Sequence, residues 1–378
     1  MDALKANREI RALANIEYEV LAKELDQIIT TKWFTKFQVC DKFENLFRLK
    51  IQSHNLLIYL PKSMFLFNNQ IQNEDLKNLL SFQTNKFTDE ISKCLENKKV
   101  VSLRKIANDR IISVNFREYS LIFELFGKGN IILVSNNDNK IVSCLRNEVW
   151  KDRKIDVDEE YKMPISERLP ENFSEFKKFI YQNEKDFIIV RLSRLPIGIN
   201  YMKIILRFLN IAEKEKAISL SEEKLEKIWN SINELQRHIR FVIFSKELSN
   251  GNNFDEELDF SFFDITKYSL DNEYQIKAEY KNSSELLFNV YYAEILKLVS
   301  ENKEDLSKNI EYQKNILIQK ISMKEKEVEL IKRYYFEIQE LLNKVKNTKD
   351  SIGSFANLSY KVEYDDKGTR KLIISIKE

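Results

Sequence analysis

Glycine, proline and cysteine are all scarce in this chain of 378 residues, which has 6 glycines, 4 prolines and 3 cysteines. So little glycine and proline excludes a collagen-like or low-complexity chain. The cysteines (Cys40, Cys94 and Cys144) are odd in number and far apart, which argues against a disulfide framework. We expect them to be buried, reduced thiols of a cytoplasmic protein.

Long apolar runs and metal-binding patterns are missing too. No apolar run reaches the roughly 18 residues of a membrane span, and the charged start MDALKANREIRAL lacks a signal-peptide core. Only two histidines occur, His54 and His238, and no Cys/His spacing fits a metal site. Neither a phosphate-binding glycine loop nor a GxSxG elbow is found. We therefore expect no membrane, no metal, no cofactor and no catalysis by this chain.

Charge and apolar side chains are abundant. Charged residues make up 32%, hydrophobic residues 43% and aromatic residues 12%, while the net charge is +2. This composition suits solvated helices around real cores. Because the charges nearly balance, any nucleic-acid surface has to be a local patch.

Apolar periodicity predicts an α+β chain. Helices are expected at 9–29 and 85–97, and strands of a mainly antiparallel sheet between 33 and 145. We divide the chain into five regions. These are an N-terminal domain at 1–165, a helix-hairpin-helix-like helical domain at 166–250, a short insert or linker at 251–283, a coiled-coil arm at 284–348 and a small β-hairpin region at 349–378.

The predicted arm contains neither glycine nor proline from Leu286 to Asn347. A 4-3 apolar seam, interrupted only by Lys324, follows its later part, which is a coiled-coil pattern. The seam consists of Leu317, Ile321, Lys324, Val328, Ile331, Tyr335, Ile338, Leu342 and Val345. Such a seam needs a partner helix, either the stretch 286–310 folded back or a helix outside this chain.

Two of the six glycines stand together in Gly127-Lys128-Gly129-Asn130, between two apolar stretches. This spacing predicts a tight strand reversal. The tetrapeptide is either a plain hairpin turn or a turn whose Lys128 and exposed amides approach a phosphate.

Three segments carry a family resemblance: DRIISVNF at 109–116, LIFELFGKGNIILVSNN at 121–137 and KIVSCLRNEVWKDRKIDVDEEYK at 140–162. They resemble the N-terminal domain of the NFACT family, the RqcH-type factors of ribosome-associated quality control in their archaeal/eukaryotic form. The resemblance implies an N-domain like that of formamidopyrimidine-type DNA glycosylases, without their chemistry. It also implies binding to large ribosomal subunits that carry stalled peptidyl-tRNA, and recruitment of tRNA for C-terminal tailing.

The family's NFACT-R part is expected after residue 378, trimmed away or supplied by a separate chain. The resemblance places tRNA contacts at Glu17, Asp109, Arg110 and the 127–130 turn with Lys128. A basic cluster around an aromatic residue suits RNA as well. That cluster consists of Arg146, Trp150, Lys151, Arg153 and Lys154. The alternatives are a surface ion pair at Asp109-Arg110 and a solvated, charge-guarded sheet edge at 146–154.

Two further hypotheses compete with the tRNA- and subunit-binding factor. One is a non-catalytic adaptor that recruits a protein through the coiled coil. The family's basic motif falls on Ser92-Lys93-Cys94, where only the lysine is kept, and this favours the adaptor. The other is a DNA-binding or repair protein, which rests on fold analogy alone.

Overall fold

The computed structural model describes residues 10–67, 80–250, 253–269, 274–346, 352–355, 358–364 and 370–376. The chain divides into two compact units, Met1–Asn302 and Lys303–Glu378. The predicted hairpin turn at 365–368 lies outside the described residues. Among the helices that are described, none combines the length and the apolar character needed to cross a bilayer.

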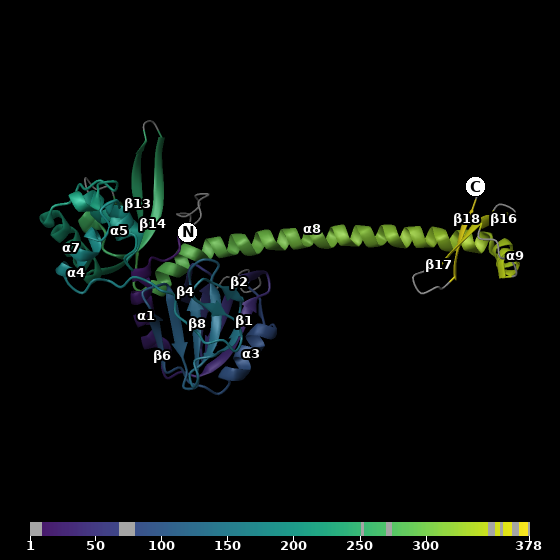
Figure 1. Ribbon diagram of the computed structural model, residues 1–378, viewed down its shortest axis with the longest axis horizontal. Helices are drawn as coiled ribbons and strands as arrows, with labels where there is room; N and C mark the ends of the chain where they lie inside the picture. Colours follow the sequence, from purple (N-terminus) through teal and green to yellow (C-terminus); the bar gives the residue numbers. More distant parts are fainter. Residues whose placement is uncertain are drawn as a thin grey trace. The chain divides into compact units, whose positions relative to one another are not determined.

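The first unit begins with two five-stranded antiparallel sheets (Figure 1). Sheet 1 has the order β4-β3-β2-β1-β5, and sheet 2 has the order β10-β9-β8-β7-β6. The strands of sheet 1 are β1 (Phe34–Cys40), β2 (Phe43–Ile51), β3 (His54–Tyr59), β4 (Ser63–Phe67) and β5 (Phe82–Gln83). Those of sheet 2 are β6 (Ser102–Ile106), β7 (Ile111–Asn115), β8 (Tyr119–Glu124), β9 (Asn130–Ser135) and β10 (Ile141–Cys144).

Sheet 2 is buried on both faces, which explains its continuous apolar runs. Alternate residues of β7 and β8, such as Ile112 and Phe123, belong to the main core. Their neighbours Ile111 and Ile122 form a second cluster with Tyr161. The small hairpin of β11 (Glu148–Val149) and β12 (Lys154–Ile155) follows β10 along the chain.

Two helices of the described residues pack on these sheets. Helix α1 (Asn15–Ile29) packs against β6, and α3 (Lys86–Leu95) packs against β1 and β10. Helix α1 starts six residues later than the predicted 9–29, because residues 10–14 form no regular structure and Ala14, with an extended backbone, takes the cap position. The side chain of Glu17 accepts the N–H of Ala14 at 2.5 Å, so this acid caps the start of the helix.

Four helices form the next region: α4 (Phe173–Tyr181), α5 (Ile188–Leu192), α6 (Ile199–Phe208) and α7 (Glu222–Arg237). Ser221 caps α7 by accepting the N–H of Lys224. A sheet of order β14-β13-β15 follows, built from β13 (Ile239–Asn250), β14 (Asn253–Phe263) and β15 (Tyr274–Tyr280). The β structure starts at Ile239, inside the stretch 166–250 that was predicted to be helical, because a β-branched and aromatic run begins there.

The predicted arm is helical. Helix α8 (Ser283–Arg333) and helix α9 (Tyr335–Lys346) are separated by one turn residue, Tyr334. In the second unit, β16 (Ile352–Phe355), β17 (Leu358–Tyr364) and β18 (Arg370–Ile376) form an antiparallel sheet. Leu341 and Val345 of α9 pack against Leu358 and Val362 of that sheet. The α+β class with antiparallel sheets is confirmed, while the helix-hairpin-helix and coiled-coil assignments stay predictions.

Candidate nucleic-acid interface

Most residues predicted to contact RNA gather at one end of sheet 2. Asp109 and Arg110 precede β7, and the N–H of Leu125 donates to the carbonyl of Arg110 at 2.8 Å. This bond places the β8–β9 turn, with Lys128 at its tip, beside Arg110. The β11–β12 hairpin reaches the same end, because Arg153 binds Glu124 of β8. We call this surface the Arg110 end.

The β8–β9 turn needs both of its glycines, for two different reasons. Gly127 and Gly129 have φ values of 58° and 75°, where side chains are strained. A Cβ on Gly127 would meet open space, whereas one on Gly129 would lie 3.0 Å from Cβ of Leu60. Gly127 therefore allows the chain reversal, and Gly129 also allows close packing on the β3–β4 connection. Lys128 between them is exposed.

Asp109 and Arg110 do not form the surface ion pair that was one of the alternatives. The carboxylate of Asp109 accepts the backbone N–H of Arg110 at 2.7 Å. Within the described residues, the guanidinium of Arg110 has no hydrogen bond or ion pair. The side-chain amide of Asn15 donates to the carbonyl of Asn108 at 2.7 Å and ties this turn to the start of α1. Arg110 thus keeps its donors available on a well-held backbone.

Arg146 stabilises the β8–β9 turn through hydrogen bonds within the protein. Its guanidinium donates to the carbonyl of Gly129 at 2.5 Å and to Oδ1 of Asn45 at 2.7 Å. The amide of Asn130 also donates to the carbonyl of Arg146. These bonds fix the β8–β9 turn against sheet 1, so Arg146 shapes the Arg110 end from within.

Arg153 is buried, unlike a side chain of a solvated edge. Its two terminal nitrogens donate to the two oxygens of Glu124 at 2.5 and 3.0 Å. The hydroxyl of Tyr161 donates to the same carboxylate. Burial alone would lower the pKa of Arg153, but the bond and charge of Glu124 raise it above its ordinary value. Arg153 therefore anchors the β11–β12 hairpin to β8.

The turn of the β11–β12 hairpin carries the exposed part of the predicted cluster. The Trp150 side chain is 50% exposed, and its Nε1 donates to Glu148. Lys151 is exposed. The ammonium of Lys154 pairs with Glu159 at 2.8 Å and with Asp156 at 3.2 Å, which neutralises it locally. Trp150 and Lys151 are consequently the hairpin's available groups.

Glu17 is not at the surface. Its side chain is fully buried, and its carboxylate receives both terminal nitrogens of Arg11 at 2.8 Å. The hydroxyl of Tyr201 in α6 donates to Oε1 of Glu17 at 2.6 Å. Arg11 continues the network to Asp259 of β14 at 2.9 Å. We therefore place Glu17 outside the exposed Arg110 end; its predicted contact with tRNA remains untested.

Arg11, Tyr201 and Glu124 belong to these networks without having been singled out in the sequence. Burial alone would lower the pKa of Arg11, but the charges of Glu17 and Asp259 raise it. Burial and the Glu17 carboxylate raise the pKa of Tyr201 well above its ordinary value. Their partners lie up to 248 residues away in the chain, so no local pattern could have identified them.

Gly198, the one glycine of the helix-hairpin-helix-like segment, serves close packing. Its φ is 129°, and a Cβ there would lie 2.6 Å from Cβ of Ala14. The carbonyl of Ile197 accepts the N–H of Ile16 at 3.2 Å. The N-terminal end of α6 thus packs against the N-terminal end of α1, so this helix start is covered by the chain itself.

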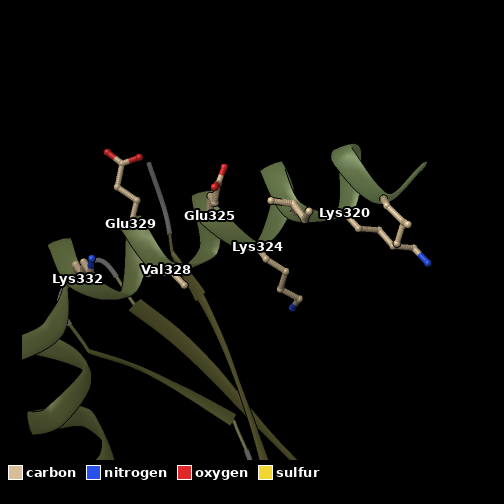
Figure 2. A pocket seen from close by; sticks show the side chains of 8 residues that line it. Lys320, Lys324, Glu325, Val328, Glu329 and Lys332 are labelled. Atoms are coloured by element: carbon tan, nitrogen blue, oxygen red, sulfur yellow. The ribbon is translucent and has the colours of Figure 1, made fainter. Parts of the chain in front are cut away.

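The part of helix α8 that belongs to the second unit carries an apolar groove (Figure 2). Leu317, Ile321 and Val328 of the predicted seam line it and are about half exposed. Glu325 and Glu329 project to one side of the helix and Lys324 to the other. Over the described ranges, no group of three or more His, Cys, Asp or Glu residues is placed to hold a metal ion.

One known structure shares this fold, and a second is reported beside it. A fibrinogen binding protein from Staphylococcus aureus matches with a TM-score of 0.53 and 17% identity, over 74% of this chain and 98% of that one. The N-terminal part of a fibronectin/fibrinogen-binding protein from Streptococcus suis has a TM-score of 0.48 and 18% identity, over 75% of this chain and 100% of that one. The first match shows a common fold and nothing about binding.

A curated relative covers nearly all of the chain. The archaeal Rqc2 homolog aRqcH of Methanocaldococcus jannaschii is 27% identical over 369 residues, which are 90% of this chain and 53% of that protein. The chain thus spans about half the length of this relative. The model of the NFACT N-terminal and middle domains matches residues 17–352. That match includes both sheets, the helical region and α8, and it shows that this chain is an RqcH-like member of the NFACT family.

Proposed function

We propose that this chain is the N-terminal and middle part of a ribosome-associated quality control factor and that it binds tRNA through the Arg110 end. The family membership supports the process. The observation that carries the site is the convergence of Arg110, Lys128, Trp150 and Lys151 at one end of sheet 2. These residues come from three separate turns, and each turn is fixed from behind by internal bonds.

The available groups suit an RNA backbone with an accessible base. Arg110 offers a planar fork of donors that matches a phosphate. Lys128 and Lys151 add positive charges, and the half-exposed ring of Trp150 offers a stacking surface. Arg146 and Arg153 supply shape, because their guanidinium groups are already bonded to the protein.

We propose that the chain itself catalyses no covalent bond formation. Its partners would be tRNA and the RNA and proteins of a large ribosomal subunit that carries a stalled peptidyl-tRNA. C-terminal tailing of the nascent chain would then use peptide-bond chemistry of the ribosome. The remaining half of the relative's length, encoded in the same or a separate chain, would act together with this one.

A second candidate function is that of an adaptor, and the α8 groove favours it. Ile321 and Val328 lie there on an apolar stripe that no other described segment covers. A coiled coil buries such a stripe against a second helix. Replacing both residues with glutamate would abolish capture of that helix while leaving tRNA affinity unchanged.

The test is a salt titration of binding to total tRNA and to duplex DNA of similar length. We would compare the wild type with Asp109→Ala/Arg110→Ala, and use Lys140→Ala as a surface-charge control. Counterion release makes the logarithm of affinity fall linearly with the logarithm of salt concentration, with a slope set by the number of phosphate contacts. We expect tRNA binding at least tenfold tighter than DNA binding, weakened tenfold or more in the double variant.

Circular dichroism would establish that the double variant keeps its fold. Equal, salt-sensitive binding to tRNA and DNA that ignores the mutations would refute the assignment of the Arg110 end. The adaptor function would then be pursued through the α8 groove.

A further inference from the structure

Three tight turns meet at the other end of helix α1. Thr31, Gln52 and Asn97 adopt positive φ values of 68°, 49° and 57° without being glycine. Thr31 ends the α1 segment, Gln52 lies between β2 and β3, and Asn97 follows α3. Together these turns bring residues 31–34, 52–54 and 97–100 side by side.

Backbone hydrogen bonds hold these segments together. The N–H of Gln52 donates to the carbonyl of Trp33 at 2.9 Å, and the N–H of Val100 donates to the carbonyl of Lys32 at 2.9 Å. The N–H of Phe34 donates to the carbonyl of Lys98 at 2.9 Å. The side chains on these turns are therefore displayed on a fixed frame.

The side chains displayed there are basic, with one large aromatic ring. Trp33 is 45% exposed, and the ammonium of Lys99 lies 4.7 Å from its ring centre. The ammonium of Lys32 lies 3.4 Å from Nε2 of His54. On the next rung of the β1–β2 ladder, Lys36 stands opposite Lys50. We define the Trp33 patch as Lys32, Trp33, Lys36, Lys50, His54 and Lys99.

No acidic side chain in the described part of the chain pairs with the four lysines of the patch. Two acids close to the patch bond elsewhere: Glu118 pairs with Lys98 at 2.9 Å, and Asp26 accepts the N–H of Leu103 at 2.7 Å. Lysines directly opposite one another on neighbouring strands repel. Burial and then the charge of Lys32 lower the pKa of His54. The patch therefore carries uncompensated positive charge.

The Trp33 patch is separate from the Arg110 end. Helix α1 touches the Arg110 end through Asn15 at its start, whereas Asp26 and Thr30, in its last turn, lie beside the patch. The 15 residues of α1 rise about 22 Å along the helix axis. One phosphate group cannot contact both surfaces.

We infer that the Trp33 patch is a second RNA-binding surface, which stacks an unpaired nucleotide on Trp33 and holds the flanking phosphates with its lysines. Exposed aromatic rings within a basic surface bind bases in this way. A protein partner fits less well, because the large apolar side chains exposed there are Trp33 and Val101. Stable protein interfaces bury about 800 Å² on each partner. The inference rests on the proposed function for the source of the RNA, a tRNA loop or subunit RNA.

The test uses the full chain and a labelled 12-nucleotide single-stranded RNA, with a duplex RNA of the same sequence as comparison. We expect Trp33→Ala to weaken single-strand binding about tenfold, since stacking is sequence-tolerant and specific to accessible bases. Trp33→Phe should keep most of the affinity, and duplex binding should change less than twofold. Phe336→Ala, which removes an 80% exposed aromatic ring of α9 outside both proposed surfaces, serves as the matched control and should leave single-strand binding unchanged.

Ultraviolet crosslinking followed by mass spectrometry should also find a nucleotide attached to Trp33. Single-strand affinity within twofold of wild type in Trp33→Ala would overturn the inference, as would an equal loss for single strand and duplex. Lys99→Gln, which keeps the ring and removes one charge, should flatten the salt dependence. If Asp109→Ala/Arg110→Ala loses tRNA binding and Trp33→Ala does not, the result supports the Arg110 end and not the Trp33 patch. The two proposed sites can therefore be refuted independently.

Discussion

The phenol of Tyr201 donates a 2.6 Å hydrogen bond to Glu17, and this bond joins helix α6 to helix α1. The same hydroxyl lies 3.0 Å from Oγ of Ser261 in β14. Arg11 completes the group with a two-point contact to Glu17 and a ring contact to Phe260 at 3.8 Å. A buried carboxylate thus connects the sheet region, the helical region and β14.

Removing the Glu17 carboxylate should destabilise the first unit strongly. Glu17→Ala leaves the Arg11 guanidinium without its main partner, and breaking a buried pair in this way costs about 3–5 kcal/mol. Urea unfolding followed by circular dichroism would measure it. Glu19→Gln on the same helix removes only an exposed pair with Lys23 and should change stability by less than about 0.5 kcal/mol. Equal losses of unfolding free energy in Glu17→Ala and Glu19→Gln would show that the buried network contributes little to stability.

Alkaline pH should weaken the same network. Burial and Glu17 raise the pKa of Tyr201 above its ordinary value, so the folded chain keeps a proton that the unfolded chain loses. The stabilisation is complete below about pH 10 and declines as the pH rises above it. Tyr201→Phe should reduce the fall in unfolding free energy between pH 9 and 11. Other buried tyrosines, such as Tyr18, leave a residual slope. If Tyr201→Phe showed the same pH dependence of the unfolding free energy as the wild type, the assignment of this effect to Tyr201 would be wrong.

The two glycines of the β8–β9 turn should respond differently to alanine. Gly127→Ala meets only the conformational cost of positive φ, about 1 kcal/mol. Gly129→Ala adds a contact with Leu60 that the turn must absorb, which costs about 1–3 kcal/mol more. Thermal unfolding of both variants would measure the difference. Equal melting temperatures would mean that the β3–β4 connection yields easily.

Arg153 and Lys151 lie two residues apart, but alanine substitutions at the two positions should affect different properties. The first should reduce stability, and the second should reduce tRNA binding. Arg153→Ala leaves Glu124 buried without its partner and should cost about 3–5 kcal/mol. Lys151→Ala should leave stability within about 0.5 kcal/mol. It should also lower the magnitude of the salt slope for tRNA by about one unit. Denaturant and salt titrations of both variants give the four values, and a stable Arg153→Ala protein would refute its role as an anchor.

Local pattern was sufficient to predict most elements of the fold. The alternating segment around Phe47 and the apolar runs on both sides of Gly127 and Gly129 form the strands that they predict. The helix expected at 85–97 forms as α3, Lys86–Leu95. Strand β4, in contrast, was not singled out, because its apolar residues are consecutive and show no alternation of apolar and polar side chains.

The candidate site was predicted less completely, because charge in a sequence does not reveal burial. Arg153 and Lys154 are neighbours with the same sign, yet one is buried against Glu124 and the other is paired at the surface. Glu17 was expected to face tRNA, while its partners Tyr201 and Arg11 bury it. The Trp33 patch was missed because three distant turns assemble it.

The buried network also orders events during synthesis. Tyr201 follows Glu17 by 184 residues and Asp259 follows Arg11 by 248 residues, so Arg11 and Glu17 leave the ribosome well before these partners. The hydroxyl of Tyr291 then closes on the carbonyl of Arg11 at 2.7 Å. Until Tyr291 has emerged, the start of α1 carries an acid and a base without their full set of partners. The polar network at the start of α1 is thus complete only after β14 and the first turns of α8 have been synthesised.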